Sequence, residues 1–145
     1  MLWKEAEVYF LWECRFAPVS GKAVQEVANR RMFSLDVVDT DDFVGLPVSA
    51  QALYFHLGMR ADDDGFVSSP KKITKMVNCM PDDLNMLIEA GYLIPFESGV
   101  VVIRDWKVNN YIQKDRYTPT RNQDERQKIT ERNRVYIVIE SQIEE

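Results

Sequence analysis

The spacing of apolar residues changes along the chain between positions 49 and 106 and predicts a succession of short elements. Apolar side chains recur at helical spacing over residues 49–61, which predicts a helix with Ser49 as its N-cap. Asp62, Asp63 and Asp64, followed by Gly65, then predict a turn. Phe66 and Val67 predict a short strand after it. The apolar face of the helix contains Ala50, Leu53, Tyr54, Leu57 and Ala61.

Two further helices are expected next, and each begins at a proline. Ser69 and Pro70 are typical of a helix start, so residues 71–77 are predicted to be helical. Pro81 opens the third helix, where Asp82 and Asp83 complement the positive end of the helix dipole, and Gly91 ends it. The expected buried residues are Ile73, Met76 and Val77 in the second helix, and Leu84, Leu87 and Ile88 in the third.

Residues 92–96 and 100–106 are apolar and flank Glu97, Ser98 and Gly99, a loop length common in β-hairpins. The order is therefore helix, strand, helix, turn, helix, hairpin. This order is the outline of a winged helix-turn-helix. We expect an α+β fold, mostly helical, with a small antiparallel wing sheet.

The chain divides into three expected parts. Residues 28–120 form the winged-helix domain, and residues 121–145 a charged C-terminal tail, with strand character only at residues 135–139. Residues 1–27 form an aromatic-rich extension. It is either an amphipathic helix docked on the core or on a partner, or the product of a start codon assigned too far upstream.

Charge is unevenly distributed. The whole chain has 18 Lys and Arg against 23 Asp and Glu, which does not by itself indicate a nucleic-acid binder. Residues 34–64 contain one base, Arg60, and seven acids, whereas residues 104–121 contain five bases and two acids. Such a domain can face phosphate with one end only.

The chemistry-bearing residues give no support for an enzyme. Cys14 and Cys79 are isolated, which argues against a zinc site and favours a reduced cytoplasmic location. His56 has no nucleophile or carboxylate at a catalytic spacing. Residues 62–65 lack the glutamate that a calcium loop needs at its twelfth position, where Ile73 stands. Residues 1–16 are too charged and too short to span a membrane. No cofactor or metal is expected.

Several motifs together resemble a known family. They are Arg30-Arg31-Met32-Phe33-Ser34, the run from Leu46 to Leu57, Asp62-Asp63-Asp64-Gly65-Phe66-Val67, Gly91-Tyr92-Leu93-Ile94, the run from Trp106 to Ile112, and Lys114-Asp115-Arg116-Tyr117. In this order they are similar to the N-terminal winged-helix domain of phage and prophage replisome organisers, the DnaD-like replication initiation proteins of low-GC Gram-positive bacteria and their phages. The resemblance covers about residues 28–120.

The resemblance implies a role in DNA replication initiation, with DNA and helicase-loading or primosome proteins as partners. It also implies self-association, which such winged-helix domains use. The sequence departs from the family at two places. Val27 stands where members commonly start with methionine, and the C-terminal domain of full-length organisers does not follow residue 120.

Two groups of polar residues in the predicted helices are candidate DNA contacts. Lys71, Lys72 and Lys75 lie on the second helix, where they either clamp phosphates or form a solvated face. On the third helix, Asn85 is the only residue suited to read bases, beside Asp82, Asp83 and Glu89. Specific readout by this helix is therefore not expected, and the acidic loop of the wing is expected to be structural.

The third group lies after the hairpin, where bases are interleaved with Trp106, Tyr111 and Tyr117. Such a segment holds a nucleic-acid backbone and stacks on unpaired bases, or its aromatics close the core with the charges outside. We favour a core role for the aromatic side chains and a nucleic-acid-binding role for the basic side chains. The candidates are Arg104, Lys107, Asn109, Asn110, Lys114, Arg116 and Arg121.

The expected function is a DNA-binding module of phage-type replication initiation that contacts mainly the backbone. The first alternative is a protein-interaction or self-association module of a primosome. The second is a transcriptional regulator, which the lack of residues suited to base readout disfavours.

Overall fold

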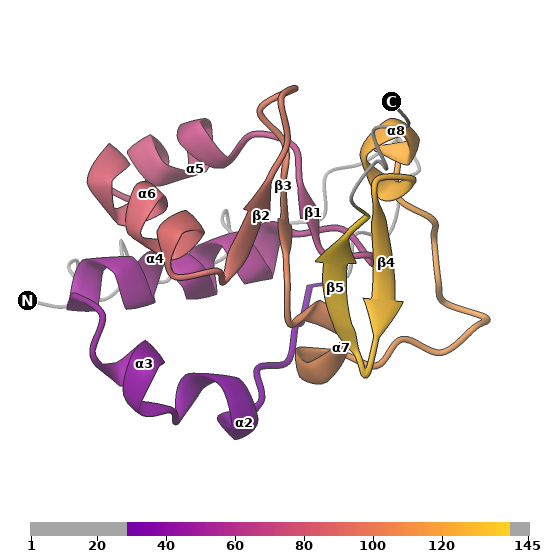
Figure 1. Cartoon of the computed structure of the whole chain (residues 1–145), viewed down its shortest axis with the longest axis horizontal. Coiled ribbons are helices and arrows are strands. Elements are labelled where there is room, and N and C mark those ends of the chain that lie inside the picture. Colours follow the sequence, from indigo (N-terminus) through magenta and orange to yellow (C-terminus); the bar gives the residue numbers. More distant parts are fainter. Residues whose placement is uncertain (1–28, 140–145) are drawn as a thin grey trace, which may run out of the picture.

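Helix α4 (Val48–Arg60) lies at the centre of the N-terminal half of the fold in the computed structural model, which describes residues 29–139. Helices α5 (Pro70–Met76) and α6 (Pro81–Glu89) pack on one side of it, and the short helices α2 (Leu35–Val38) and α3 (Asp41–Val44) lie on the other (Figure 1). Small antiparallel sheets follow. The expected α+β class is confirmed.

The predicted apolar face of α4 forms the centre of the core. Ala50, Leu53, Tyr54 and Leu57 are each 0% exposed. Phe43 and Tyr92 meet the Tyr54 ring edge-on at centroid distances of 5.2 and 5.9 Å. The helical spacing read from the sequence therefore identified the buried side of this helix correctly.

Both helices that were expected to begin at a proline are present, but one residue expected to be buried in α5 is exposed. Helix α5 begins at Pro70 and ends at Met76, and its inward stripe is Pro70, Ile73, Thr74 and Val77. Met76, expected to be buried, is 56% exposed because it lies outside this i, i+3, i+4, i+7 stripe. Helix α6 buries Leu84 and Leu87 as predicted, and Gly91 follows it with a φ of 86°.

A three-stranded antiparallel sheet has the order β1-β3-β2, formed by Phe66–Val67, Val101–Ile103 and Leu93–Pro95 respectively. The predicted hairpin is confirmed, with Ile94 opposite Val102. Its second strand is shorter than expected, because the chain turns after Ile103 into α7 (Trp106–Asn109). Gly65 has a φ of 88°, and a Cβ there would lie 2.5 Å from the Trp106 ring, so this position requires glycine.

Residues 121–139 do not form the expected tail. They fold into α8 (Gln123–Arg126) and an antiparallel hairpin of β4 (Ile129–Arg132) and β5 (Val135–Val138) (Figure 1). Ile129 and Tyr136 are 3% and 2% exposed, and the Tyr136 amide donates to the Arg104 carbonyl at 3.0 Å. The hairpin thus extends the core beyond residue 120. The strand expected at residues 135–139 is confirmed.

The expectations for residues 1–27, including Cys14, lie outside the described residues. Within residues 29–139, none of the helices has the length and apolar character needed to cross a membrane.

Candidate nucleic-acid interface

Helix α5 presents its three lysines to solvent. Thr74 is 2% exposed and its hydroxyl donates to the Pro70 carbonyl at 2.7 Å, which fixes the inward side of the helix. Lys71, Lys72 and Lys75 are exposed, and none forms an ion pair with another described residue. Their ammonium groups are therefore available to an external anion.

Helix α6 presents less negative charge than its sequence indicates. Asp83 is 5% exposed, and its carboxylate accepts from the Ser49 hydroxyl at 2.7 Å and from the Met80 amide at 2.9 Å. Asp82, Asn85 and Glu89 are exposed. Ser49 is not the expected N-cap: the N-cap of α4 is Pro47, two residues earlier, and the Ser49 side chain joins α4 to α6.

The bases just after β3 contact other parts of the protein. Arg104 pairs with Asp105 at 3.0 Å, and its guanidinium lies 5.5 Å from the Tyr92 ring. The Lys107 ammonium lies 4.0 Å from Asp64 and 5.8 Å from the Tyr117 ring centre. The Arg104 and Lys107 side chains are 36% and 30% exposed, so only a minor part of each is accessible to an outside ligand.

The two asparagines proposed as DNA contacts are buried instead. Asn109 accepts from the Ser34 amide at 2.9 Å and donates to the Tyr54 hydroxyl at 2.8 Å. Asn110 accepts from the Met32 amide at 2.8 Å. Their exposed fractions are 5% and 6%. These amides satisfy backbone groups of residues 32–34, and we correct their assignment from DNA contact to structural support.

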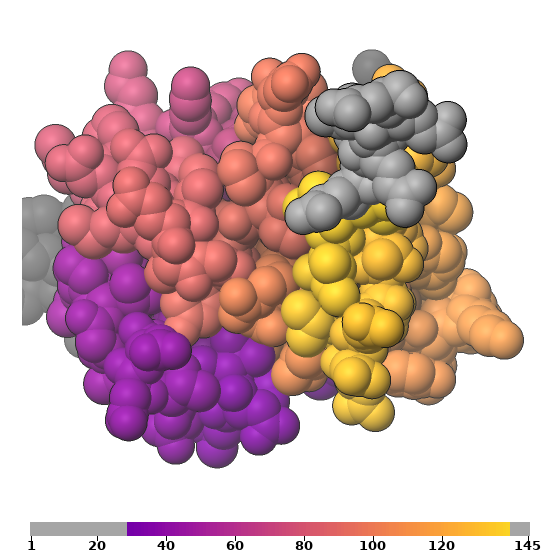
Figure 2. Space-filling model, in the orientation of Figure 1, coloured from indigo at the N-terminus to yellow at the C-terminus, as the bar shows by residue number. Residues whose placement is uncertain are grey.

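Further along the same segment, Lys114, Arg116 and Arg121 are exposed. Residues 112–119 lie at the edge of the molecule away from α5 and α6 (Figure 2). The candidate basic residues therefore fall into two separate groups, the α5 lysines and the exposed bases of residues 114–121. The loop Glu97-Ser98-Gly99 lies between β2 and β3, and its Ser98 hydroxyl donates to Glu125 at 2.7 Å, which agrees with the expected structural role.

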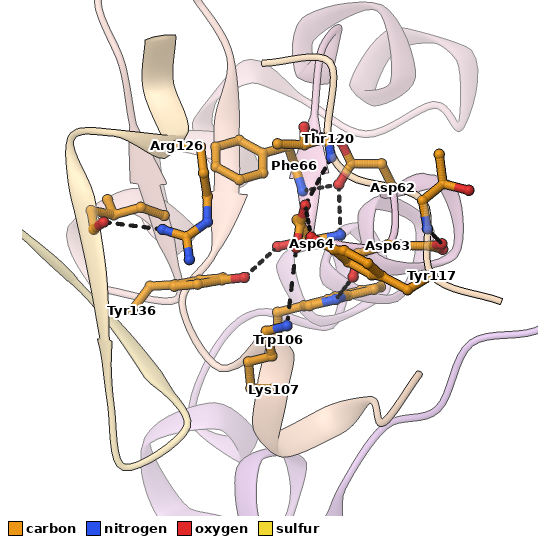
Figure 3. Close-up of polar contacts among 12 residues, drawn as sticks. Asp62, Asp63, Asp64, Phe66, Trp106, Lys107, Tyr117, Thr120, Arg126 and Tyr136 are labelled. Atoms are coloured by element: carbon orange, nitrogen blue, oxygen red, sulfur yellow. Dashed lines mark hydrogen bonds and ion pairs between the residues drawn. The ribbon is translucent and has the colours of Figure 1, made fainter. Parts of the chain in front are cut away.

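The acidic turn of Asp62, Asp63 and Asp64 holds the second basic group against the domain (Figure 3). Asp62 accepts from the Thr120 hydroxyl, Asp63 from the Thr118 amide at 2.9 Å, and Asp64 from the Thr120 amide at 2.8 Å. The turn predicted from the sequence is present, but its carboxylates act as the anchor for residues 117–120. The sequence alone gave no sign of this role.

Aromatic side chains complete this anchor. Trp106 donates its indole N–H to the Asp63 carbonyl, and Tyr136 its hydroxyl to the Asp64 carbonyl, both at 2.8 Å (Figure 3). Trp106 is 1% exposed, in agreement with the expected core role, but Tyr111 is 80% exposed, so the same expectation is wrong for Tyr111. Burial and the Asp64 carboxylate raise the pKa of Tyr117 to about 12, so its hydroxyl stays a hydrogen-bond donor at neutral pH.

The chain was compared with models of protein families, with curated protein sequences and with solved structures, and none of the three comparisons found a match.

Proposed function

We propose that this chain is a winged-helix DNA-binding module of phage-type replication initiation, which holds the DNA backbone without strong sequence readout. The observation that carries the proposal is the set of three exposed lysines on α5, none of which forms an ion pair with another described residue. Cations that no internal carboxylate neutralises add affinity for phosphate and release counterions when they bind it.

Two further observations support the proposal. The order α4, β1, α5, α6, β2, β3, with β1 pairing beside the hairpin, is the order expected of a winged helix. The motifs of residues 28–120 also resemble replisome organisers, whose role implies helicase-loading or primosome proteins as further partners. Lys114, Arg116 and Arg121 provide a second exposed basic group.

Weak sequence readout follows from the exposed side chains of α6. Asn85 is the only residue on this helix able to form a bidentate contact with a base, and it lies between Asp82 and Glu89. Carboxylates near phosphate oppose close insertion of this helix. The binding that we propose therefore depends on salt far more than on sequence.

The experiment is fluorescence anisotropy of the whole chain with labelled duplex DNA over a range of salt concentrations. The triple variant K71E/K72E/K75E should lose most of the binding. A variant in which these lysines become glutamine should lower the slope of log K against log salt by roughly 2.7, for three phosphate contacts. The matched control is R30E/R60E/K128E, which makes the same charge change at exposed positions elsewhere. Equal losses in the two glutamate variants would contradict the assignment to α5.

A second candidate function, self-association, is favoured by apolar side chains that are exposed at the starts of α4 and α6, which the Ser49–Asp83 hydrogen bond joins. Val48 is 81% exposed and Met80 65%, on either side of the Ser49–Asp83 hydrogen bond. Exposed apolar clusters of this kind mark protein interfaces. A concentration-dependent increase in mass by light scattering that Val48→Glu abolishes, together with no DNA binding, would favour this candidate.

A further inference from the structure

An open cleft lies between residues 106–117 and the β4–β5 hairpin. Its volume is about 600 Å³, within the range of roughly 300–1,000 Å³ that is typical of small-ligand sites. Tyr111, Tyr117 and Lys107 line one side, and Glu131 and Arg134 belong to the hairpin on the other. The fold of residues 121–139 therefore creates a site that a disordered tail would not.

The two tyrosines of the cleft differ in a way that suits stacking. Tyr117 is held in place because its hydroxyl lies 2.7 and 2.8 Å from the two carboxylate oxygens of Asp64, and Lys107 lies over its ring. Tyr111 is 80% exposed, although an aromatic ring of its size usually finds a packing partner. One ring is thus preorganised, and the other has a large free surface.

The charges of the cleft suit a phosphate-bearing ligand. Arg134 is exposed and forms no ion pair with another described residue. It adopts a φ of 66° in the two-residue loop between β4 and β5, a position that usually prefers glycine. An arginine there adds conformational cost, so the turn alone does not account for this side chain. Asp63, an acid of the lining, is neutralised by Arg31 at 3.1 Å.

We propose that this cleft binds an unpaired nucleotide of single-stranded DNA. The base stacks on Tyr111 and Tyr117, while Lys107 and Arg134 contact the adjoining phosphates. Stacking accepts any base, so the site selects strand type and not sequence. This inference rests on the proposed DNA-binding function and adds a second, single-strand site to it, apart from the α5 lysines.

The test uses the whole chain and a labelled oligo-dT of about 15 nucleotides, with a duplex of the same length as the second probe. Tyr111→Ala should weaken oligo-dT binding by roughly tenfold, or about 1.4 kcal/mol, because one base loses its stacking partner. Tyr111→Phe keeps the ring and should bind as the unmodified chain does. Arg134→Gly removes the cation in a conformation that glycine accepts and should also weaken oligo-dT binding. Duplex binding should stay unchanged in all three variants.

Photocrosslinking locates the bound strand independently of affinity. An oligonucleotide containing bromouracil should crosslink to Tyr111 or Tyr117. If Tyr111→Ala binds oligo-dT normally, or if crosslinks fall only on α5, the cleft proposal is overturned while the proposed function stands. If the unmodified chain binds neither oligo-dT nor duplex, both proposals fail.

Discussion

The hydroxyl of Tyr117 lies within 2.8 Å of both carboxylate oxygens of Asp64, although 53 residues separate them in the chain. Asp64 is 3% exposed and also accepts from the Thr120 amide. A buried carboxylate normally requires such partners. This carboxylate therefore fixes the path of the segment that leads from α7 to α8.

We expect Asp64→Asn to destabilise the fold. The amide keeps the size of the side chain but removes the charge that strengthens the bonds from Tyr117 and Thr120. Hydrogen bonds to a charged group contribute about 1.5–3 kcal/mol, so the free energy of unfolding should fall by about that amount. Urea denaturation measures it. Asp115→Asn, an exposed acid of the same segment, is the control and should stay within about 0.5 kcal/mol of the unmodified chain.

Asp62 gives a prediction about pH. Burial raises the pKa of this carboxyl above its usual value, against the hydrogen bonds from Thr120, Phe66 and Asp64 that lower it. Between the unfolded and folded pKa values the native state binds more protons, so the contribution of Asp62 to stability increases as pH falls. Above the folded pKa, the buried charge is a cost.

The measurement is urea denaturation of the unmodified chain and of Asp62→Asn at several pH values between 7 and about 4. Other carboxyl groups titrate in both proteins, so the difference in unfolding free energy isolates Asp62. The unfolding free energy of the unmodified chain should increase relative to that of Asp62→Asn as pH falls. A difference that moves the other way would mean that the hydrogen bonds outweigh burial.

Local signals in the sequence predicted most elements of the fold. Pro70 and Pro81 mark helix starts, because proline lacks the N–H group that the first turn of a helix leaves without a partner. Gly91 marks a helix end, because glycine readily adopts the left-handed conformation found there. The apolar stripe of α4 predicted its buried side. These features act over a few residues, so they can be read without knowing the tertiary structure.

The folded C-terminal region could not be predicted in this way. Ile129 and Tyr136 are its buried apolar side chains, and Ile129 stands alone between the polar residues Lys128 and Thr130. Residues 135–139 are nearly all apolar, so no alternation indicates which side faces the core. Their burial depends on Asp64 and Arg104, which lie far away in the sequence.

In the candidate site, too, features set by local sequence could be predicted, whereas features set by distant residues could not. Lysine spacing on α5 could be read as one exposed face, and the structure places all three lysines at the surface. The amides of Asn109 and Asn110 are typical of nucleic-acid contacts in composition, but their partners are residues 32–34, more than seventy positions earlier. Residue type alone does not separate these two roles.

The Ser49–Asp83 hydrogen bond should couple α4 to α6 energetically. Ser49→Ala and Asp83→Asn each remove part of the contact, which is 2.7 Å long between Oγ and Oδ1. Combined in a double-mutant cycle, they should show a coupling of about 0.5–3 kcal/mol, because contacting residues are not additive. Unfolding free energies from urea denaturation provide the four values. Additivity within about 0.3 kcal/mol would show that the bond contributes nothing to stability.

Tyr136 and Ile137 test whether residues 129–138 belong to the core. They are neighbours on β5, yet Tyr136 is 2% exposed and Ile137 41% exposed, because successive side chains of a strand point to opposite faces. Tyr136→Ala removes a buried ring and the hydrogen bond to the Asp64 carbonyl, so it should lower the free energy of unfolding by about 3–5 kcal/mol. Ile137→Ala should cost less than about 1 kcal/mol, since this side chain is partly exposed on the outer face of the strand and lies outside the core. Urea denaturation compares the two. Similar small losses would mean that this hairpin folds independently of the α4–α6 core, and the cleft beside Arg134 would then lose its fixed wall.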